Sequence, residues 1–145
     1  MDLIIDATVI FTGFIGTGVT KDIVFSNVVR LFSPEYLFNE FEEHKLRIKE
    51  LSGLPEHELD ELLSKFKSRI TIVPREEFEK FLLEANLLVS DKDDTEYLAL
   101  SLSMKKTPIW SNDSHFKEQS IIEILTTSEL VKHLKSLGYE FSTSA

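Results

Sequence analysis

The stretch Leu3-Ile4-Ile5-Asp6 indicates the fold class, because three branched apolar residues in a row are too few for a helix and end at an acid. Such a short apolar run is typical of a strand buried on both faces, as in a parallel sheet. The first predicted strand therefore ends in a carboxylate. Further strands are predicted at 69–73, 107–111 and 121–125, where apolar or β-branched residues stand between turn signals.

Apolar residues at helical spacing lie between these strands. A glycine loop at 13–18 is expected to precede a helix that Thr20 caps and that reaches Leu31. Asp93 and Glu96 form an acidic capping box, which favours a helix over a strand for the segment that follows. The other predicted helices run from Ser33-Pro34 to Gly53 and over 56–69, 76–88 and 126–138. Strands alternating with helices predict an α/β domain with a mostly parallel sheet.

Composition indicates one globular domain over residues 1–145, since 42% of the side chains are hydrophobic and no linker or repeat divides the chain. No apolar stretch reaches the length of a membrane span, and no secretory signal is recognised, so we expect a cytoplasmic protein without membrane contact. The absence of cysteine excludes disulfides, thiolate metal ligands and cysteine nucleophiles.

The net charge of -9, from 25 acids and 16 bases, gives the chain no general attraction for a polyanion. A nucleic-acid substrate would need local bases or bridging cations. Lys21, Lys92 and Lys117 are the candidate RNA contacts, with Arg30 a further one, because most of them flank loops expected to surround the strand ends. Lys117, just past Asp113, is the leading candidate.

Four acids have reason to converge. Asp6 and Asp113 follow predicted strands, and open parallel sheets bind ligands at the carboxyl ends of their strands. Glu40 lies at the edge of an apolar helical stripe that also holds His44. Asp94 begins a strongly apolar helix and is expected to point its carboxylate into the region that this helix packs against.

Each acid also has an ordinary structural explanation. Asp6 and Asp113 are common turn residues, Glu40 stands in a very polar run, and Asp93 and Asp94 suit a helix start. Jointly they are more informative, because carboxylates brought together raise one another's pKa unless a cation neutralises them. Oxygen ligands without cysteine favour Mg²⁺ or Mn²⁺, which suit phosphodiester chemistry.

In order and spacing, four segments resemble the PIN-domain ribonucleases, a family that includes the toxin halves of toxin–antitoxin pairs. The first segment is the strand ending at Asp6, with Thr8 where a small polar residue is usual and Ala7 where Ser or Thr is common. Ser33-Pro34 followed by Glu40 is similar to the second. The third and fourth are Asp91 to Leu100, in which Asp94 matches the acid, and Ile109 to Phe116, in which Asp113 does.

The resemblance covers nearly the whole chain. A stand-alone archaeal and bacterial branch of PIN proteins is similar in Glu40 with His44, in the break at Gly53 and in Trp110-Ser111-Asn112-Asp113. It implies a three-layer α/β/α fold with a five-stranded parallel sheet in the order 3-2-1-4-5. It also implies a Mg²⁺ or Mn²⁺ site formed by Asp6, Glu40, Asp94 and Asp113, and cleavage of single-stranded RNA. Asp91 and Asp93 stand beside Asp94 as alternatives for the third ligand.

Several residues are candidates for supporting roles. Thr8, Asp91 and His44 are possible neighbours of the site, as is His115, and Ser111 or Asn112 could orient a water molecule. The glycine-rich segment 13–18 lacks the Gly-Lys-Ser/Thr ending of a phosphate-binding loop, so we interpret it as a flexible loop rather than a nucleotide site.

We therefore expect a metal-dependent endoribonuclease in which the four acids hold the ions that activate water. The principal alternative is an interaction or scaffold module with the same fold and no useful catalysis. A phosphotransferase that uses Asp6 as nucleophile is disfavoured, because Thr8 stands where a partner Asp is expected. The expected partner is RNA. An antitoxin protein and a homodimer are further candidate partners that the sequence leaves open.

Overall fold

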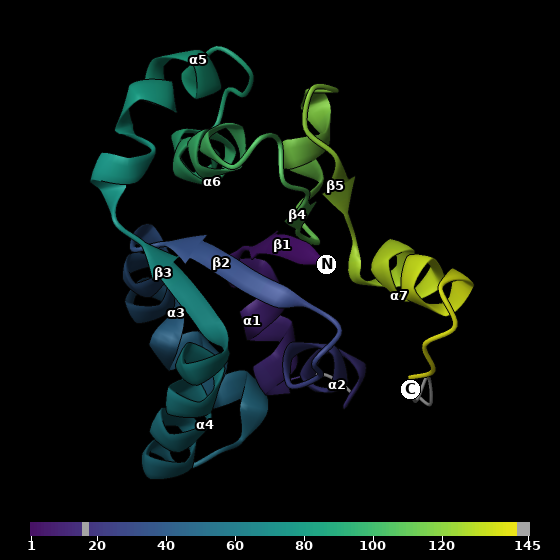
Figure 1. The fold of residues 1–145 in the computed structure, drawn as a ribbon. Coiled ribbons are helices and arrows are strands. Elements are labelled where there is room, and N and C mark those ends of the chain that lie inside the picture. The colour runs from purple at the N-terminus through teal and green to yellow at the C-terminus, as the bar shows by residue number, and fades with distance from the viewer. Residues whose placement is uncertain (16–17, 142–145) are drawn as a thin grey trace.

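A computed structural model of the chain describes residues 1–15 and 18–141 (Figure 1). Its centre is a sheet of five parallel strands in the order β3-β2-β1-β4-β5, which confirms the expected topology. The strands are β1 (Asp2–Ile5), β2 (Arg30–Pro34), β3 (Ile70–Val73), β4 (Ile109–Trp110) and β5 (Ile124–Leu125). Because the strands are parallel, all five end at the same edge of the sheet.

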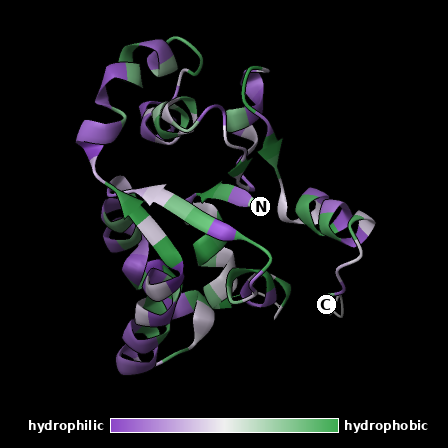
Figure 2. Cartoon of the chain, viewed as in Figure 1, coloured by the Kyte–Doolittle hydropathy of each residue, from purple (hydrophilic) through white to green (hydrophobic). Residues whose placement is uncertain are grey.

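Helices cover both faces of this sheet, which makes three layers (Figure 1). Leu3 and Ile5 of β1 pack into one apolar cluster and Ile4 into the other, so the strand is buried on both sides. Hydrophobic residues accordingly dominate the strands, whereas hydrophilic ones are spread over the helices (Figure 2). The helices of the first cluster are α1 (Ala7–Ile15), α2 (Gly18–Val24), α3 (Tyr36–Ser52), α4 (Glu56–Arg69) and α7 (Thr127–Ser136); those of the second are α5 (Leu82–Asn86) and α6 (Lys92–Ser103).

The strand β2 was not predicted, because its residues also fit the ends of two helices. The sequence pattern places Leu31 in a helix and Ser33-Pro34 at the start of the next, but all three lie in β2. Ser33 is buried and its hydroxyl donates to the carbonyl of Ile5, 3.0 Å away. Proline is tolerated here because it stands at the end of the strand, and α3 begins two residues later, at Tyr36.

The predicted glycine loop is partly wrong, because Gly13 lies inside α1. A Cβ at this position would lie 2.8 Å from Cζ of Phe66, so the missing side chain lets α1 approach α4 closely. Gly18 begins α2, and Thr20 is a buried residue within that helix rather than its cap. The remaining loop positions, 16 and 17, lie outside the described residues.

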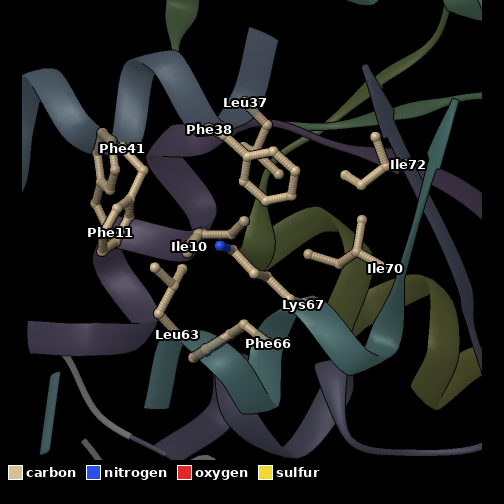
Figure 3. Close-up of a pocket in the computed structure, with 10 residues that line it drawn as sticks. All are labelled: Ile10, Phe11, Leu37, Phe38, Phe41, Leu63, Phe66, Lys67, Ile70 and Ile72. Atoms are coloured by element: carbon tan, nitrogen blue, oxygen red, sulfur yellow. The ribbon is translucent and has the colours of Figure 1, made fainter. Parts of the chain in front are cut away.

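The helices α3 and α4 pack with α1 on the face of β3 that carries Ile70 and Ile72, as Figure 3 shows. Gly53 ends α3 in a left-handed conformation (φ 69°), as predicted. Between these helices lies an apolar cavity of about 10 Å³, and Nζ of Lys67 sits 4.5 Å above the ring of Phe38 at its wall (Figure 3). A cavity of this size holds at most one water molecule, and its apolar lining disfavours even that.

The predicted helix over 76–88 is interrupted in the structure. Two 3₁₀ turns, Arg75–Glu77 and Glu79–Phe81, precede the short helix α5. Phe78 stands between the turns with φ -124° and ψ 1°, outside helical geometry, and its side chain is buried in the second cluster. Burial of this ring therefore outweighs helix continuity.

The C-terminal part of the chain has the predicted types of element, but its strands are shorter than predicted: β4 covers 109–110 of the predicted 107–111, and β5 covers 124–125 of the predicted 121–125. The segment Tyr97 to Met104 is helical as expected and belongs to α6, which ends at Ser103. Thr126 caps α7 by accepting from the N–H of Glu129, and Gly138 follows this helix with φ 96°. None of the helices in the described part of the chain has the length and apolar character that crossing a membrane requires.

Candidate metal centre

Asp6 lies where β1 meets α1, at the carboxyl edge of the sheet. Its Oδ1 accepts hydrogen bonds from the Thr8 hydroxyl at 2.6 Å and from the N–H of Val9 at 3.3 Å, and its Oδ2 accepts from the Ser111 hydroxyl at 2.5 Å. The side chain is only 3% exposed. Burial raises the pKa of Asp6 to about 6, although the three hydrogen bonds act in the opposite direction.

Ser111 joins Asp6 to Asp113. Its buried hydroxyl donates to Asp6 and accepts from the N–H of Asp113 at 3.0 Å. The Asp113 carboxylate in turn accepts from the N–H of His115 at 2.9 Å and caps the 3₁₀ helix Ser114–Glu118. The neighbouring strands β1 and β4 thus bring these two acids together at one edge, as the strand-end argument predicts.

Asn112 and Thr8 connect the loop after β4 to its neighbours. The N–H of Asn112 donates to the Thr8 hydroxyl at 3.3 Å, and Oδ1 of Asn112 accepts from the N–H of Thr127 at 2.9 Å. The Asn112 side chain therefore holds the start of α7, and the Ser111 hydroxyl holds Asp6. These contacts give both residues a positioning role, whereas the sequence suggested that either could orient water.

Glu40 approaches the cluster from α3 and is half-buried. Its Oε1 accepts a hydrogen bond of 2.6 Å from the hydroxyl of Tyr97, a buried residue of α6. Burial raises the pKa of Glu40 to about 7, and the charges of Asp6 and Asp93 act in the same direction, while the bond from Tyr97 opposes them.

Asp94 lies in the first turn of α6 and is only 4% exposed. Its Oδ2 is buried and has no hydrogen-bond partner among the described residues. Burial is the largest cause that raises the pKa of Asp94 to about 8, and the charges of Asp113, Asp91, Asp6 and Glu40 contribute to the same rise. The four predicted acids therefore lie close enough to act on one another electrostatically, and the bare buried oxygen indicates a place for a cation.

The start of α6 differs from the predicted capping box. Asp91 is the capping residue, since its side chain accepts from the N–H of Asp93 at 2.9 Å. Asp93 instead accepts from the hydroxyl of Tyr36 at 2.6 Å, and Glu96 pairs with Arg75 at 3.6 Å. Because Asp91 caps the helix, Asp94 lies three residues later, at the end of the first turn, where its side chain is buried at the cluster.

His115 comes closer to the acids than the sequence indicated. Single ligand atoms of Asp91, Asp94 and His115 all lie within 4.8 Å of one another. The Nδ1 atom of His115 is 3.3 Å from Oδ1 of Asp113 and 3.9 Å from Oδ2 of Asp91. The available sequence signal was its position two residues after Asp113. His44, by contrast, is an exposed residue of α3 whose ring meets the edge of Phe11, 5.3 Å between centroids.

The candidate basic residues are divided between the two ends of the sheet. Lys92 is exposed at the start of α6, beside the acids, and Lys117 lies after Asp113 but forms an ion pair of 2.5 Å with Glu129. Arg30 pairs with Asp2 at the opposite, N-terminal end of β1. Lys21 belongs to α2, which links the far end of α1 to the start of β2 (Figure 1).

A cleft of about 920 Å³ lies along the N-terminal turns of α3 and α6. Tyr36 and Asp93 connect its two sides, and Phe78 and Leu82 contribute apolar surface. Its charged lining is mainly acidic, with four carboxylates and two basic side chains: Glu35, Glu79, Asp93, Glu96, Arg75 and Lys92. This cleft would not attract RNA phosphates without a cation.

The donor set fits a divalent cation. Carboxylate oxygens predominate, one imidazole is close by, and the chain has no thiolate. Hard divalent ions prefer such oxygen donors, and a bound ion would neutralise carboxylates whose pKa values are raised. Asp6, Glu40, Asp94 and Asp113 are the residues that could hold it, with Asp91 and His115 adjacent.

Comparison with known proteins bears on the family of the chain. A protein-family model described as the PIN domain matches residues 4–135, which run from the middle of β1 to nearly the end of α7. No curated protein matches the chain.

Proposed function

This chain belongs to the PIN domain family, and from that membership we propose that it is a Mg²⁺- or Mn²⁺-dependent endoribonuclease of single-stranded RNA. PIN domains are generally nucleases that use divalent metals, and Asp91, Asp94 and His115, beside Asp113, form a group that could hold a metal ion. The observation that carries the proposal is Oδ2 of Asp94, which is buried without a hydrogen-bond partner in the described part of the chain and lies among the charges of Asp6, Glu40 and Asp113.

Under this proposal the four acids hold the metal and the surrounding residues fix the acids. A bound divalent ion would supply an activated water and stabilise the leaving oxygen of a phosphodiester. Ser111 and Thr8 orient Asp6 by hydrogen bonds to both of its oxygens, and Tyr97 orients Glu40. These side chains keep the carboxylates in place while the RNA strand binds.

Single-stranded RNA is proposed because an acidic protein must rely on the metal and on few local bases for phosphate contacts. Lys92 is the described candidate that is nearest in sequence to Asp94 and exposed. We extend the proposal to a toxin of a toxin–antitoxin pair, in which a partner protein would restrain the activity.

The test is cleavage of unstructured RNA by the purified protein, with Mn²⁺ or Mg²⁺ and with EDTA. Cleavage should require the metal and disappear in Asp113→Asn. Activity that survives both EDTA and Asp113→Asn would contradict the proposed mechanism. Inactivity on many RNAs, with metal binding demonstrated by titration, would favour the alternative of an interaction module.

A further inference from the structure

The group formed by Asp91, Asp94 and His115 is distinct in composition from the four acids predicted to bind metal. Its three ligand atoms lie within 4.8 Å of one another, a separation that one ion can bridge. They come from two segments, the first turn of α6 and the 3₁₀ helix after β4, so the fold brings them together across about twenty residues of chain.

A second observation indicates a ligand at this group. Oδ2 of Asp94 is buried without a partner among the described residues, and Asp94 as a whole is 4% exposed. A carboxylate oxygen is rarely buried without a hydrogen bond or a cation, because the lost hydration has to be replaced. Within the described residues, Oδ2 of Asp94 therefore has no partner, and Asp91 and His115 each supply a further ligand atom close to Asp94.

The approach of His115 supports the same conclusion. Its Nδ1 lies near the carboxylates of Asp113 and Asp91, at 3.3 and 3.9 Å, yet in the described structure no hydrogen bond joins this nitrogen to either acid. The ring nitrogen thus lies near both carboxylates but forms a hydrogen bond to neither. Ligand atoms that surround one metal ion are arranged in the same way.

We propose that Asp91, Asp94 and His115 form a cation subsite that selects first-row transition ions over Mg²⁺. Imidazole nitrogen binds such ions well, whereas Mg²⁺ prefers oxygen donors and gives up its water reluctantly. The subsite shares Asp94 with the four-acid site. Its role in catalysis therefore rests on the proposed function. Among the metals considered, it favours Mn²⁺ as the working ion.

The competing explanation is a protonated His115 that forms ion pairs with Asp91 and Asp113. In that case the imidazolium would repel a cation, and removing it would strengthen the binding of every divalent ion. If His115 is a metal ligand, its removal weakens the binding of transition ions and leaves Mg²⁺ binding nearly unchanged. The two explanations therefore predict opposite changes in Mn²⁺ affinity for a variant that lacks His115.

The experiment is a titration of the metal-free protein with Mn²⁺, followed by electron paramagnetic resonance, and with Mg²⁺ in competition. Asp91→Asn and His115→Gln are the test variants, and His133→Gln, an exposed histidine of α7, is the control. Asparagine is as good a helix cap as aspartate, and the backbone N–H of His115 still bonds to Asp113, so both variants should fold.

We expect pulsed resonance of the Mn²⁺ complex to show coupling to an imidazole nitrogen, which His115→Gln abolishes and the control retains. The Mn²⁺ dissociation constant should rise about 10-fold in His115→Gln, with the Mg²⁺ constant changed less than about 2-fold. Asp91→Asn should weaken Mn²⁺ binding similarly and keep the nitrogen coupling.

Missing nitrogen coupling in the wild type, or tighter binding of both ions in His115→Gln, would overturn the subsite. If Mn²⁺ binds and Asp6→Asn abolishes binding while His115→Gln has no effect, this inference fails and the proposed function stands. Failure of every divalent ion to bind would refute both.

Discussion

The hydroxyl of Tyr97 in α6 donates a 2.6 Å hydrogen bond to Oε1 of Glu40 in α3, and this bond joins the two helices at the acidic cluster. A second bond of the same length runs the other way, from Tyr36 of α3 to Asp93 of α6. The tyrosine and the acid are four residues apart on each helix, so the two bonds are about one turn apart. The bond from Tyr97 holds the Glu40 carboxylate itself, whereas the bond from Tyr36 joins the same helices through the exposed Asp93.

The first prediction concerns Tyr97. Replacing it with Phe removes a buried hydrogen bond to a carboxylate, which should lower the free energy of unfolding by about 1–2 kcal/mol. It should also weaken Mn²⁺ binding several-fold, because Glu40 loses its orientation. Denaturant unfolding and Mn²⁺ titration measure the two effects. Tyr36→Phe is the matched control, since its partner Asp93 is exposed and its loss should cost about 0.5 kcal/mol or less.

Equal metal affinities in the wild type and in Tyr97→Phe would show that the hydroxyl supports only the packing of α6. A large loss of affinity in Tyr36→Phe would instead assign the positioning to the outer bond.

A second prediction concerns the pH dependence of the metal-free protein. Burial raises the pKa of Asp94 to about 8, so between its unfolded value of 3.8 and about 8 the folded state binds more protons than the unfolded state. The free energy of unfolding should therefore fall as pH rises through this window and level off above it. Glu40 and Asp6, with pKa values raised to about 7 and about 6, act in the same direction.

Asp94→Asn isolates this contribution. In EDTA the variant should be nearly as stable as the wild type at pH 4 and more stable by several kcal/mol at pH 9, because a buried charge without a hydrogen-bond partner among the described residues has been removed. Unfolding curves from pH 4 to pH 9 provide the comparison. A variant that is less stable at every pH would mean that the Asp94 carboxylate has a structural partner instead.

Particular residues show which parts of this site the sequence could specify. Asp6 and Asp113 were predictable because each directly follows a short apolar run, and parallel strands must end at one edge. The strand β2 was not, because Ser33-Pro34 is also a common helix start and its hydrogen bond to Ile5 depends on the neighbouring strand. Gly13 indicated a loop. In the structure, glycine suits this helical position because the ring of Phe66, about fifty residues away in sequence, leaves no room for a Cβ.

The contacts that complete the site have no local sequence pattern. The bond from Tyr97 to Glu40 joins residues 57 positions apart, and the placement of His115 depends on the turn that Asp113 caps. The unpartnered oxygen of Asp94 is a property of packing, since the acid itself would suit an exposed helix start equally well. Such features depend on how segments that are distant in sequence pack together, so no local sequence pattern predicts them.

A third prediction concerns stabilisation by metal. A divalent ion that binds only the folded state at 100 times its dissociation constant adds about 2.7 kcal/mol to the free energy of unfolding. Mn²⁺ or Mg²⁺ should therefore raise the melting temperature of the wild type by several degrees. Asp6→Asn should lose most of this response, because the variant keeps the size of the side chain and one acceptor oxygen but not the charge. Thermal scans with metal and with EDTA test it, and equal responses in the two proteins would exclude Asp6 from the site.

The last prediction concerns Lys117, whose ammonium is paired with the carboxylate of Glu129 at 2.5 Å. Glu129 also belongs to the cap of α7, where its backbone N–H and its Oε1 both contact the Thr126 hydroxyl. Glu129→Gln should leave this cap intact, because glutamine suits the same capping box, while it releases Lys117. The released lysine should then be free to contact an RNA phosphate beside Asp113.

We expect Glu129→Gln to bind a cleavage-resistant single-stranded RNA more tightly than the wild type in the presence of Mn²⁺. The slope of log affinity against log salt should steepen by about 0.7, the value for one added phosphate contact on a single strand. Lys117→Ala should show the shallower slope in either background, and Lys132→Ala, an exposed lysine of α7, is the control. Fluorescence anisotropy over a range of salt concentrations measures these slopes. If Glu129→Gln, Lys117→Ala and the wild type share one slope, RNA does not pass Lys117, and Lys92 becomes the remaining candidate beside the acids.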